Sequence, residues 1–339
     1  MGWKLWFSGT ALAAIHIVVL SARFLAPYDP AEQNRELAFT PPTRLHWVDA
    51  AGHFHLRPFV YGSVNVPGDG GAEHYSEDRS RVCPVRFFVR ADDTKAGALR
   101  LFGVDDPGRI FLLGTDDFGR DQFSRLLYGG QISLLAGLFA TALTLGVGLL
   151  LGGVAGYFGS WVDEVIMRAA EIFMALPWIY LLFAVRAFLP LRLDARGTFL
   201  LLIGVVGLTG WARPSRLIRG IVLSAKQRDY VRAARGFGAS PAYILWRHVL
   251  PETWGVVLTQ AALLVPQYIL AEVALSFLGL GVGEPAASWG NMLASLQRYY
   301  VLSSYSWMFA SGLVLVPVFL LYYSLADALQ TRLRKAELR

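Results

Sequence analysis

Six long runs of hydrophobic residues alternate with polar segments along this chain of 339 residues. A helix needs roughly 20 apolar residues to cross the hydrocarbon core of a bilayer. Backbone polar groups must be paired internally in lipid, so runs of this length favour helices. The runs predict six transmembrane helices, at about residues 5–26, within the uncharged stretch 126–162, at 161–188 continuing past Pro177, at 197–217, at 253–280 and at 304–325.

The longest polar stretch, residues 28–125, separates the first two runs. Apolar and polar residues alternate at 53–57 and again at 85–90, which is typical of short strands. The glycine-rich sequence at 67–71 is typical of a turn. We therefore expect a small β-rich cap in an otherwise all-α integral membrane protein.

The composition agrees with a membrane location. Hydrophobic residues make up 55% of the chain, charged residues 17%, and the mean hydropathy is +0.44. Because soluble domains carry about 25% charged residues, a soluble enzyme is excluded. The single cysteine, Cys83, excludes an intrachain disulfide and a cysteine-rich metal site.

Basic residues predict the orientation of the helices. The net charge is +6, and the loop after the fourth run carries many cations against one acid, Asp229. Short loops rich in Lys and Arg stay in the cytoplasm, so the charge indicates topology and no nucleic-acid partner. Both termini are then cytoplasmic and residues 28–125 external. The basic residues of the loop are Arg213, Arg216, Arg219, Lys226, Arg228, Arg232, Arg235 and Arg247.

This orientation divides the chain into four parts. They are an N-terminal segment with the first span (1–27), the external segment (28–125), a core with five spans and the cytoplasmic loop 213–251 (126–330), and a cytoplasmic tail (331–339).

The cytoplasmic loop predicts two short helices lying on the membrane surface, within residues 224–246. Gly238 interrupts the first helix, and Ser240 followed by Pro241 is typical of an N-cap with proline at the first helical position. Pro251 is expected to end the second helix at the membrane surface. Such a helix, turn and helix favours docking onto another protein, although a basic interfacial helix that binds lipid headgroups fits the same pattern.

Four sequence blocks lie at 114–121, within the loop at 229–251, at 271–281 and at 288–293. Together they resemble the C-type permease subunit of dipeptide, oligopeptide and nickel ABC importers. The loop resembles the EAA loop of that family, although Arg232 replaces its glutamate and His248 its isoleucine. The resemblance covers about residues 113–339 and, more loosely, the first span. The blocks are 114–116 with 119–121, the loop residues Asp229, Tyr230, Arg232, Ala233, Ala234, Gly238, Ser240, Pro241, Leu250 and Pro251, the stretch 271–281 that contains Glu272 and Ser276, and 288–293.

The resemblance implies a type I importer permease fold with six spans in a bacterial inner membrane. It also implies a paralogous permease subunit that completes the path for peptides or similar solutes, two cytoplasmic ATPase subunits that grip the loop at 224–251, and an external solute-binding protein. ATP and magnesium would bind the ATPase subunits, because this chain has no phosphate-binding Gly-Lys-Ser/Thr loop and no cofactor site of its own. We expect the chain to catalyse no covalent chemistry.

Several residues within the spans suggest packing or transport roles. Gly148, Gly152 and Gly156 recur every fourth residue, so a neighbouring helix can approach closely. Glu272, with Ser276 one turn later, lies in the outer half of its span. There the carboxylate either lines the translocation path or its gate, or is satisfied by a neighbouring helix. Arg168 and Glu171 are spaced for an ion pair.

Three other hypotheses arise from the sequence. His53 and His55 would share one face of a strand, as two metal ligands could, and His46 and His74 lie in the same external segment. An ion-coupled carrier or channel without an ATPase is the alternative function, but paired charges at mid-membrane depth are missing from the sequence. An intramembrane hydrolase is excluded by the lack of a Gly-x-Ser-x-Gly or His-Glu-x-x-His motif.

Overall fold

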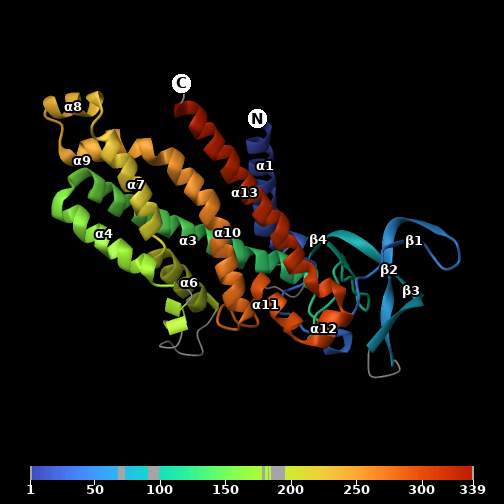
Figure 1. The fold of residues 1–339 in the computed structure, drawn as a ribbon. Coiled ribbons are helices and arrows are strands. Elements are labelled where there is room, and N and C mark those ends of the chain that lie inside the picture. The colour runs from blue at the N-terminus through green and yellow to red at the C-terminus, as the bar shows by residue number, and fades with distance from the viewer. Residues whose placement is uncertain are drawn as a thin grey trace. The chain divides into compact units, whose positions relative to one another are not determined.

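The computed structural model is mostly helical with one small sheet, and it describes residues 2–67, 73–90, 99–177, 180–181, 183–184 and 195–337 (Figure 1). The α-helices are α1 (Gly2–Leu20), α2 (Ala22–Leu25), α3 (Gln122–Phe158), α4 (Ser160–Ala175), α6 (Ala195–Thr209), α7 (Ala212–Ala225), α8 (Asp229–Gly236), α9 (Pro241–Ile244), α10 (Trp254–Phe277), α11 (Trp289–Ala294), α12 (Tyr299–Ser304) and α13 (Ala310–Glu337). Shorter helical turns are Arg35–Leu37, Leu245–Val249, Leu250–Thr253, Ser295–Gln297 and Ser306–Phe309.

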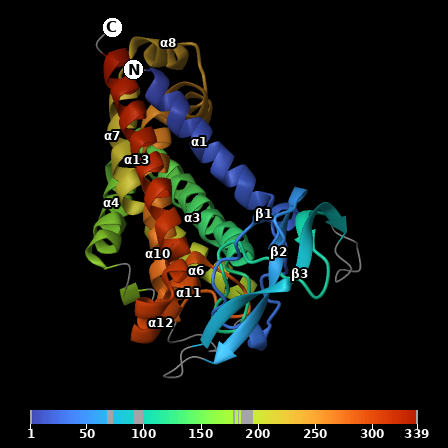
Figure 2. The same ribbon diagram turned by 90° about the vertical axis from the view of Figure 1, so that its right-hand side faces the viewer.

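Contacts divide the chain into two compact units. The first unit contains Met1–Leu12, Leu134–Glu272 and Pro317–Arg339, and the second contains Ala13–Ser133 and Val273–Val316. Within the first unit, the start of α1, the end of α13 and the short helix α8 lie at the same end in both views (Figures 1 and 2). An even number of membrane crossings between the two termini would produce this arrangement.

Four helices in the described part of the chain are long and apolar enough to span a membrane. They are Trp3–Leu20, Gln122–Phe158, the continuous helical run Pro241–Phe277 and Ser306–Lys335. A fifth span exists if the bent pair Gly197–Thr209 and Ala212–Ala225 counts as one. The helical membrane fold is confirmed, and the described residues account for up to five of the six expected spans.

The third expected span does not continue as a helix through Pro177. Helix α4 ends at Ala175, and Leu176 has an extended conformation with φ −80° and ψ 120°. The residue before a proline is pushed out of the α region by the proline ring, which explains this end. Residues 178–179, 182 and 185–194, where the rest of the span was expected, lie outside the described residues.

The fourth expected span, at 197–217, contains a bend of 42° between α6 and α7. Pro214 has no N–H to donate to the carbonyl of Gly210, and the helical ladder is interrupted there. At Gly210 the hydroxyl of Tyr268 occupies the space that a Cβ would need. That hydroxyl is also 3.0 Å from the Thr144 hydroxyl, so side chains from α3 and α10 meet at the bend.

The polar segment contains the expected small sheet, with strands β1 (His46–Val48), β2 (Phe54–Pro67), β3 (Glu73–Arg90) and β4 (Leu99–Val104). All neighbours are antiparallel, in the order β1-β2-β3-β4. Val60, Cys83, Val85 and Ile110 form its buried core, and the Cys83 thiol is free. The expected turn at 67–71 lies beyond Pro67, outside the described residues.

Candidate functional site

The basic loop forms a compact hook, which we define as residues 224–251. Helix α8 begins at Asp229, and Gly238 turns the chain with φ +81°, a conformation that favours glycine. Ser240 then caps α9, since its Oγ accepts a hydrogen bond from the Tyr243 N–H at 3.3 Å, and Pro241 occupies the first turn. The local sequence thus builds the helix, turn and helix that it predicts.

Pro251 does not end the second helix of the hook, so that expectation was wrong. The chain passes from α9 through a π turn at Leu245–Val249 and a 3₁₀ turn at Leu250–Thr253 directly into α10. The Leu250 N–H bonds the Leu245 carbonyl and the Trp254 N–H bonds the Pro251 carbonyl. The wider and the tighter turns accommodate a proline that has no N–H. The hook is therefore continuous with a membrane helix.

Buried side chains fix the hook to the helix bundle of its unit. Val231 of α8 and Ile244 of α9 are buried, as are Leu245, Val249 and Leu250. They form one hydrophobic cluster with Ile218, Val222 and Ala225 of α7. Because the same cluster holds both hook helices and α7, a force on the hook reaches the bundle through packed side chains.

The opposite surface of the hook carries exposed aromatic side chains, which the sequence motifs did not reveal. Phe237, between Gly236 and Gly238, is 92% exposed, and Tyr243 and Trp246 are more than half exposed. In the sequence, the position of Phe237 between two glycines is the signal that could have identified this exposed surface. Exposed aromatic residues beside arginine have the composition of an interface hot spot.

The other motif residues of the hook vary in their contacts. Asp229 and Arg232 are exposed and their side chains are 3.7 Å apart, a separation that contributes little. Tyr230 donates from its hydroxyl to Glu252 Oε1 at 3.0 Å. Ala233 is exposed and Ala234 is half-buried against the hydrophobic cluster.

Arg219 and Lys226 make close polar contacts within the chain. Arg219 on α7 makes a two-pronged ion pair with Asp163 in the first turn of α4. Lys226 donates from Nζ to the carbonyls of Gly156 at 2.7 Å and Tyr157 at 3.4 Å, which caps the end of α3. The exposed ion pair between Arg168 and Glu171, at 3.0 Å, was expected from their spacing.

The glycine stripe of α3 faces α7. A Cβ at Gly152 would overlap the carbonyl oxygen of Ser215, and one at Gly156 would lie 2.8 Å from Val222 Cβ. At Gly148 the nearest atom would be Pro214 Cβ at 3.1 Å. The two helices therefore pack backbone against backbone along these three positions.

Glu272 and Ser276 near the end of α10 are both buried within the chain. Ser276 Oγ accepts a hydrogen bond from the Val282 N–H at 3.2 Å. Glu272 is engaged in an interaction, so the alternative of a satisfied carboxylate has support. Their role in a translocation path stays a prediction.

A second polar site, which we call the arginine cluster, consists of Asp116, Arg120, Arg125 and Glu284 in the second unit. Both arginines are almost fully buried, and both donate to the Glu284 carboxylate, Arg120 from Nη1 and Nη2 and Arg125 from Nη2 at 3.0 Å. Asp116 Oδ2 accepts from Arg120 Nε at 2.7 Å. The cluster ties the loop before α3 to the segment between α10 and α11.

Backbone hydrogen bonds shape the loop that supplies the arginine cluster. Asp116 Oδ1 accepts from the N–H groups of Phe118 at 2.9 Å and Arg120 at 3.0 Å. Gly119 has φ +72°, and a Cβ there would overlap the Asn34 carbonyl. Only glycine fits this position, which explains the Gly-Arg-Asp part of the motif.

The block at 288–293 joins the same unit. Ser288 and Asn291 form a capping box at the start of α11. The buried Trp289 donates from its indole N–H to the Leu126 carbonyl at 2.9 Å. The blocks 114–121 and 288–293 therefore lie in the second unit together with residues 273–281, whereas residues 271–272 and the hook belong to the first.

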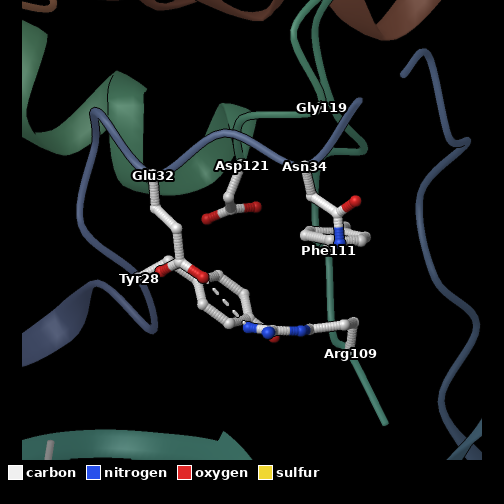
Figure 3. Close-up of a pocket in the computed structure, with 7 residues that line it drawn as sticks. All are labelled: Tyr28, Glu32, Asn34, Arg109, Phe111, Gly119 and Asp121. Atoms are coloured by element: carbon white, nitrogen blue, oxygen red, sulfur yellow. Dashed lines mark hydrogen bonds and ion pairs between the residues drawn. The ribbon is translucent and has the colours of Figure 1, made fainter. Parts of the chain in front are cut away.

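Beside the arginine cluster, Asp121 points toward a cavity of about 10 Å³ that is also lined by Tyr28, Glu32 and Arg109 (Figure 3). Burial raises the pKa of Asp121 to about 7, against the opposing hydrogen bonds from the Ser124 hydroxyl and N–H. Within the described residues, Asp121 Oδ1 has no hydrogen-bond partner. A protonated carboxyl suits this position better than a carboxylate.

We expect the stability of the protein to fall as the pH rises from about 4 to about 7, because Asp121 then ionises more readily in the unfolded chain. Below about pH 4, the ordinary pKa of aspartate, the protonated Asp121 contributes its full share to the free energy of unfolding. Between pH 4 and about 7 this contribution falls by up to about 1.4 kcal/mol per pH unit. Asp121→Asn should remove this slope in thermal unfolding followed by tryptophan fluorescence.

The control is Asp78→Asn. Hydrogen bonds from Ser80 lower the pKa of Asp78, so it titrates below this pH window and its replacement should leave the slope intact. An unchanged slope in Asp121→Asn would show that another group titrates.

Three histidines of the segment 28–125, His46, His53 and His55, pair with carboxylates. His55 Nε2 lies 3.0 Å from Asp49 Oδ2, and His53 Nδ1 lies 3.4 Å from the same oxygen. The hydrogen bond with His55 is the main cause that lowers the pKa of Asp49 to about 2. His46 binds Glu77 at 3.0 Å, and the side chain of His74 lies outside the described residues. The described histidines therefore have protein partners that account for their positions.

Comparison with known proteins places these features in a family. Residues 148–335 match the sequence profile of the binding-protein-dependent transport system inner membrane component. The oligopeptide transport system permease protein OppC of Bacillus subtilis is 36% identical over 234 residues, which are 68% of this chain and 74% of that protein.

Two further relatives show similar likeness. The dipeptide transport system permease protein DppC of Bacillus subtilis is 38% identical over 68% of this chain and 71% of its own length. The glutathione transport system permease protein GsiD of Pectobacterium atrosepticum is 34% identical over 68% of this chain and 75% of its own length. Among solved structures, the MetNI methionine ABC transporter matches with a TM-score of 0.47 and 17% identity, over 61% of this chain and 95% of that one.

Proposed function

Because this chain belongs to the family of binding-protein-dependent transport system inner membrane components, we propose that its hook is the site where a cytoplasmic ATPase docks and drives transport. The chain is a transmembrane permease subunit of an ABC importer, and its partners in general are ATPase and binding-protein subunits. It is a multi-pass membrane protein and not an enzyme, since ATP hydrolysis lies in separate subunits.

The observation that carries this proposal is the contrast between the two faces of the hook. One face is buried against α7, and the other presents Phe237 almost fully exposed. A rigid element with an exposed aromatic anchor suits insertion into a groove of a partner. The continuity of the hook with α10 then carries a movement of the partner into a membrane helix.

We propose that the importer contains a paralogous permease subunit, two ATPase subunits that bind ATP and magnesium, and an external solute-binding protein, in a bacterial inner membrane. The hook and both termini face the cytoplasm. The basic loop and the position of the three segments at one end of the first unit support this orientation (Figures 1 and 2).

We propose peptides as the substrate class, because several relatives at 36–38% identity are peptide permease proteins. Glu272 and Ser276 are proposed to act near the outer gate of the path. Both are buried in this chain, so they would act through its packing rather than by direct contact in a cleft of their own. An ion-coupled carrier without an ATPase is not favoured, since the family and its relatives are components of ABC importers.

Replacing Phe237 with alanine should weaken binding of the ATPase subunits by about 2 kcal/mol, roughly 30-fold, because a central aromatic anchor is lost. Binding of the purified ATPase subunits is measured on inside-out membrane vesicles, together with ATP-dependent uptake in proteoliposomes. Wild-type binding should be confined to inside-out vesicles.

The matched control is Phe54→Ala, which removes an exposed phenylalanine from the sheet. It should leave ATPase binding unchanged. Full affinity and uptake in Phe237→Ala would reject the proposed docking surface, and binding to right-side-out vesicles would reject the orientation.

A further inference from the structure

A cavity of about 510 Å³ is lined by the first turns of α1 and the last turns of α13. The start of α1 and the end of α13 lie at the same end of the first unit (Figures 1 and 2). Its lining includes Lys4, Leu5 and Trp6 from α1, and Asp327, Arg332 and Lys335 from α13. Cavities of 300–1,000 Å³ accommodate small-molecule ligands. The hook and the arginine cluster are made by other residues, so the proposed coupling function does not use this space.

The charges of the cavity favour an anion. Three cationic side chains, Lys4, Arg332 and Lys335, stand against one carboxylate, Asp327. Arg332 and Lys335 are three residues apart on α13, so they lie on the same side of the helix. A phosphate group can bind several cationic side chains at once, and basic pockets between membrane helices at the cytoplasmic side bind anionic lipid headgroups.

The rest of the lining favours a ligand with an apolar part. Leu5 and Trp6 lie on the side of α1 that borders the cavity, and the Trp6 side chain is 74% exposed. Tryptophan and leucine add nothing to the binding of a free inorganic phosphate. Tryptophan is enriched where headgroups meet acyl chains. A ligand that joins a phosphate to hydrocarbon chains would therefore contact both the cationic and the apolar residues that line the cavity.

A helix of another membrane subunit fits this cavity less well. Burying a lysine or an arginine in an apolar interface between helices is unfavourable, and the cavity is lined by three such residues. We propose that the cavity binds one anionic phospholipid of the phosphatidylglycerol type, with its phosphate held by Lys4, Arg332 and Lys335 and its acyl chains against Leu5 and Trp6. The bound lipid would tie the two ends of the chain together.

The test uses the full chain in detergent and native mass spectrometry with added phosphatidylglycerol or phosphatidylcholine. We expect one phosphatidylglycerol to bind at least tenfold more tightly than phosphatidylcholine. Replacing Lys4, Arg332 and Lys335 together with glutamine should abolish this preference. The control replaces the exposed Arg216, Arg235 and Arg247, which removes the same charge from the same unit and should change the affinity less than twofold.

Other outcomes would overturn the proposal. An equal loss in both triple variants would mean that the lipid responds to overall charge, and displacement by millimolar glycerol phosphate would mean that the acyl chains play no part. A photoactivatable phosphatidylglycerol tests the wild-type chain without any substitution, and its cross-links should map to residues 4–6 and 327–335. Cross-links that map to other residues would show that the lipid binds elsewhere and would overturn the proposal.

Discussion

Gly152→Leu should remove the folded protein from the membrane, because the new side chain has no space between α3 and α7. Even a Cβ at position 152 would overlap the Ser215 carbonyl oxygen and lie 3.0 Å from Ser215 Cα. These are backbone atoms that cannot rotate away, so the two helices would have to separate. Overpacking of flexible cores costs about 1–3 kcal/mol, and we expect a larger loss here because the obstacle is backbone. Detergent-extracted yield and the unfolding temperature measure the effect.

Gly146→Leu is the matched control for this prediction. Gly146 lies on the same helix, and a Cβ there meets nothing within 4 Å. The same substitution also replaces a poor helix former with a good one, which favours the helix by about 0.8 kcal/mol. If Gly152→Leu and Gly146→Leu gave the same yield and unfolding temperature, close packing of α3 on α7 would be wrong.

Glu284→Gln should destabilise the protein by about 2–3 kcal/mol, because two buried arginines would then share Asp116 as their remaining carboxylate in the cluster. Breaking a buried ion pair typically costs 3–5 kcal/mol. The effect expected here is smaller than this range, since the Glu284 side chain is 46% exposed and water compensates part of the loss. Thermal or denaturant unfolding in detergent measures it.

Glu171→Gln controls for the removal of a charge. Glu171 pairs with Arg168 at the same nominal distance of 3.0 Å, but both side chains are exposed, so the expected loss is below about 0.5 kcal/mol. A double variant of Glu284→Gln with Arg125→Gln should recover part of the loss, because one excess buried cation is removed. If the changes in the free energy of unfolding caused by the two substitutions were strictly additive, Glu284 and Arg125 would not interact.

Local sequence predicts those features that depend on neighbouring residues. Ser240 and Pro241 start a helix because the hydroxyl and the proline act within one turn. The glycine spacing on α3 predicts a close neighbour, because residues four apart share a helix face. Hydropathy did not predict the bend before Pro214 or the end of α4 before Pro177. It measures how favourably side chains transfer into lipid, and it contains no information on the backbone N–H that a proline lacks.

Hydrophobic length, charge and turn residues act over short distances, so the sequence alone predicts a helical membrane protein with a basic hook and a small sheet between the first two hydrophobic runs. Which charges meet and which aromatic residue stays exposed depends on the packing of the helices. Arg120 and Glu284 are 164 positions apart, and Arg219 and Asp163 are 56 apart. Such pairs form because helix packing brings distant segments together, and Phe237 is exposed because the buried contacts of the hook are made by other residues.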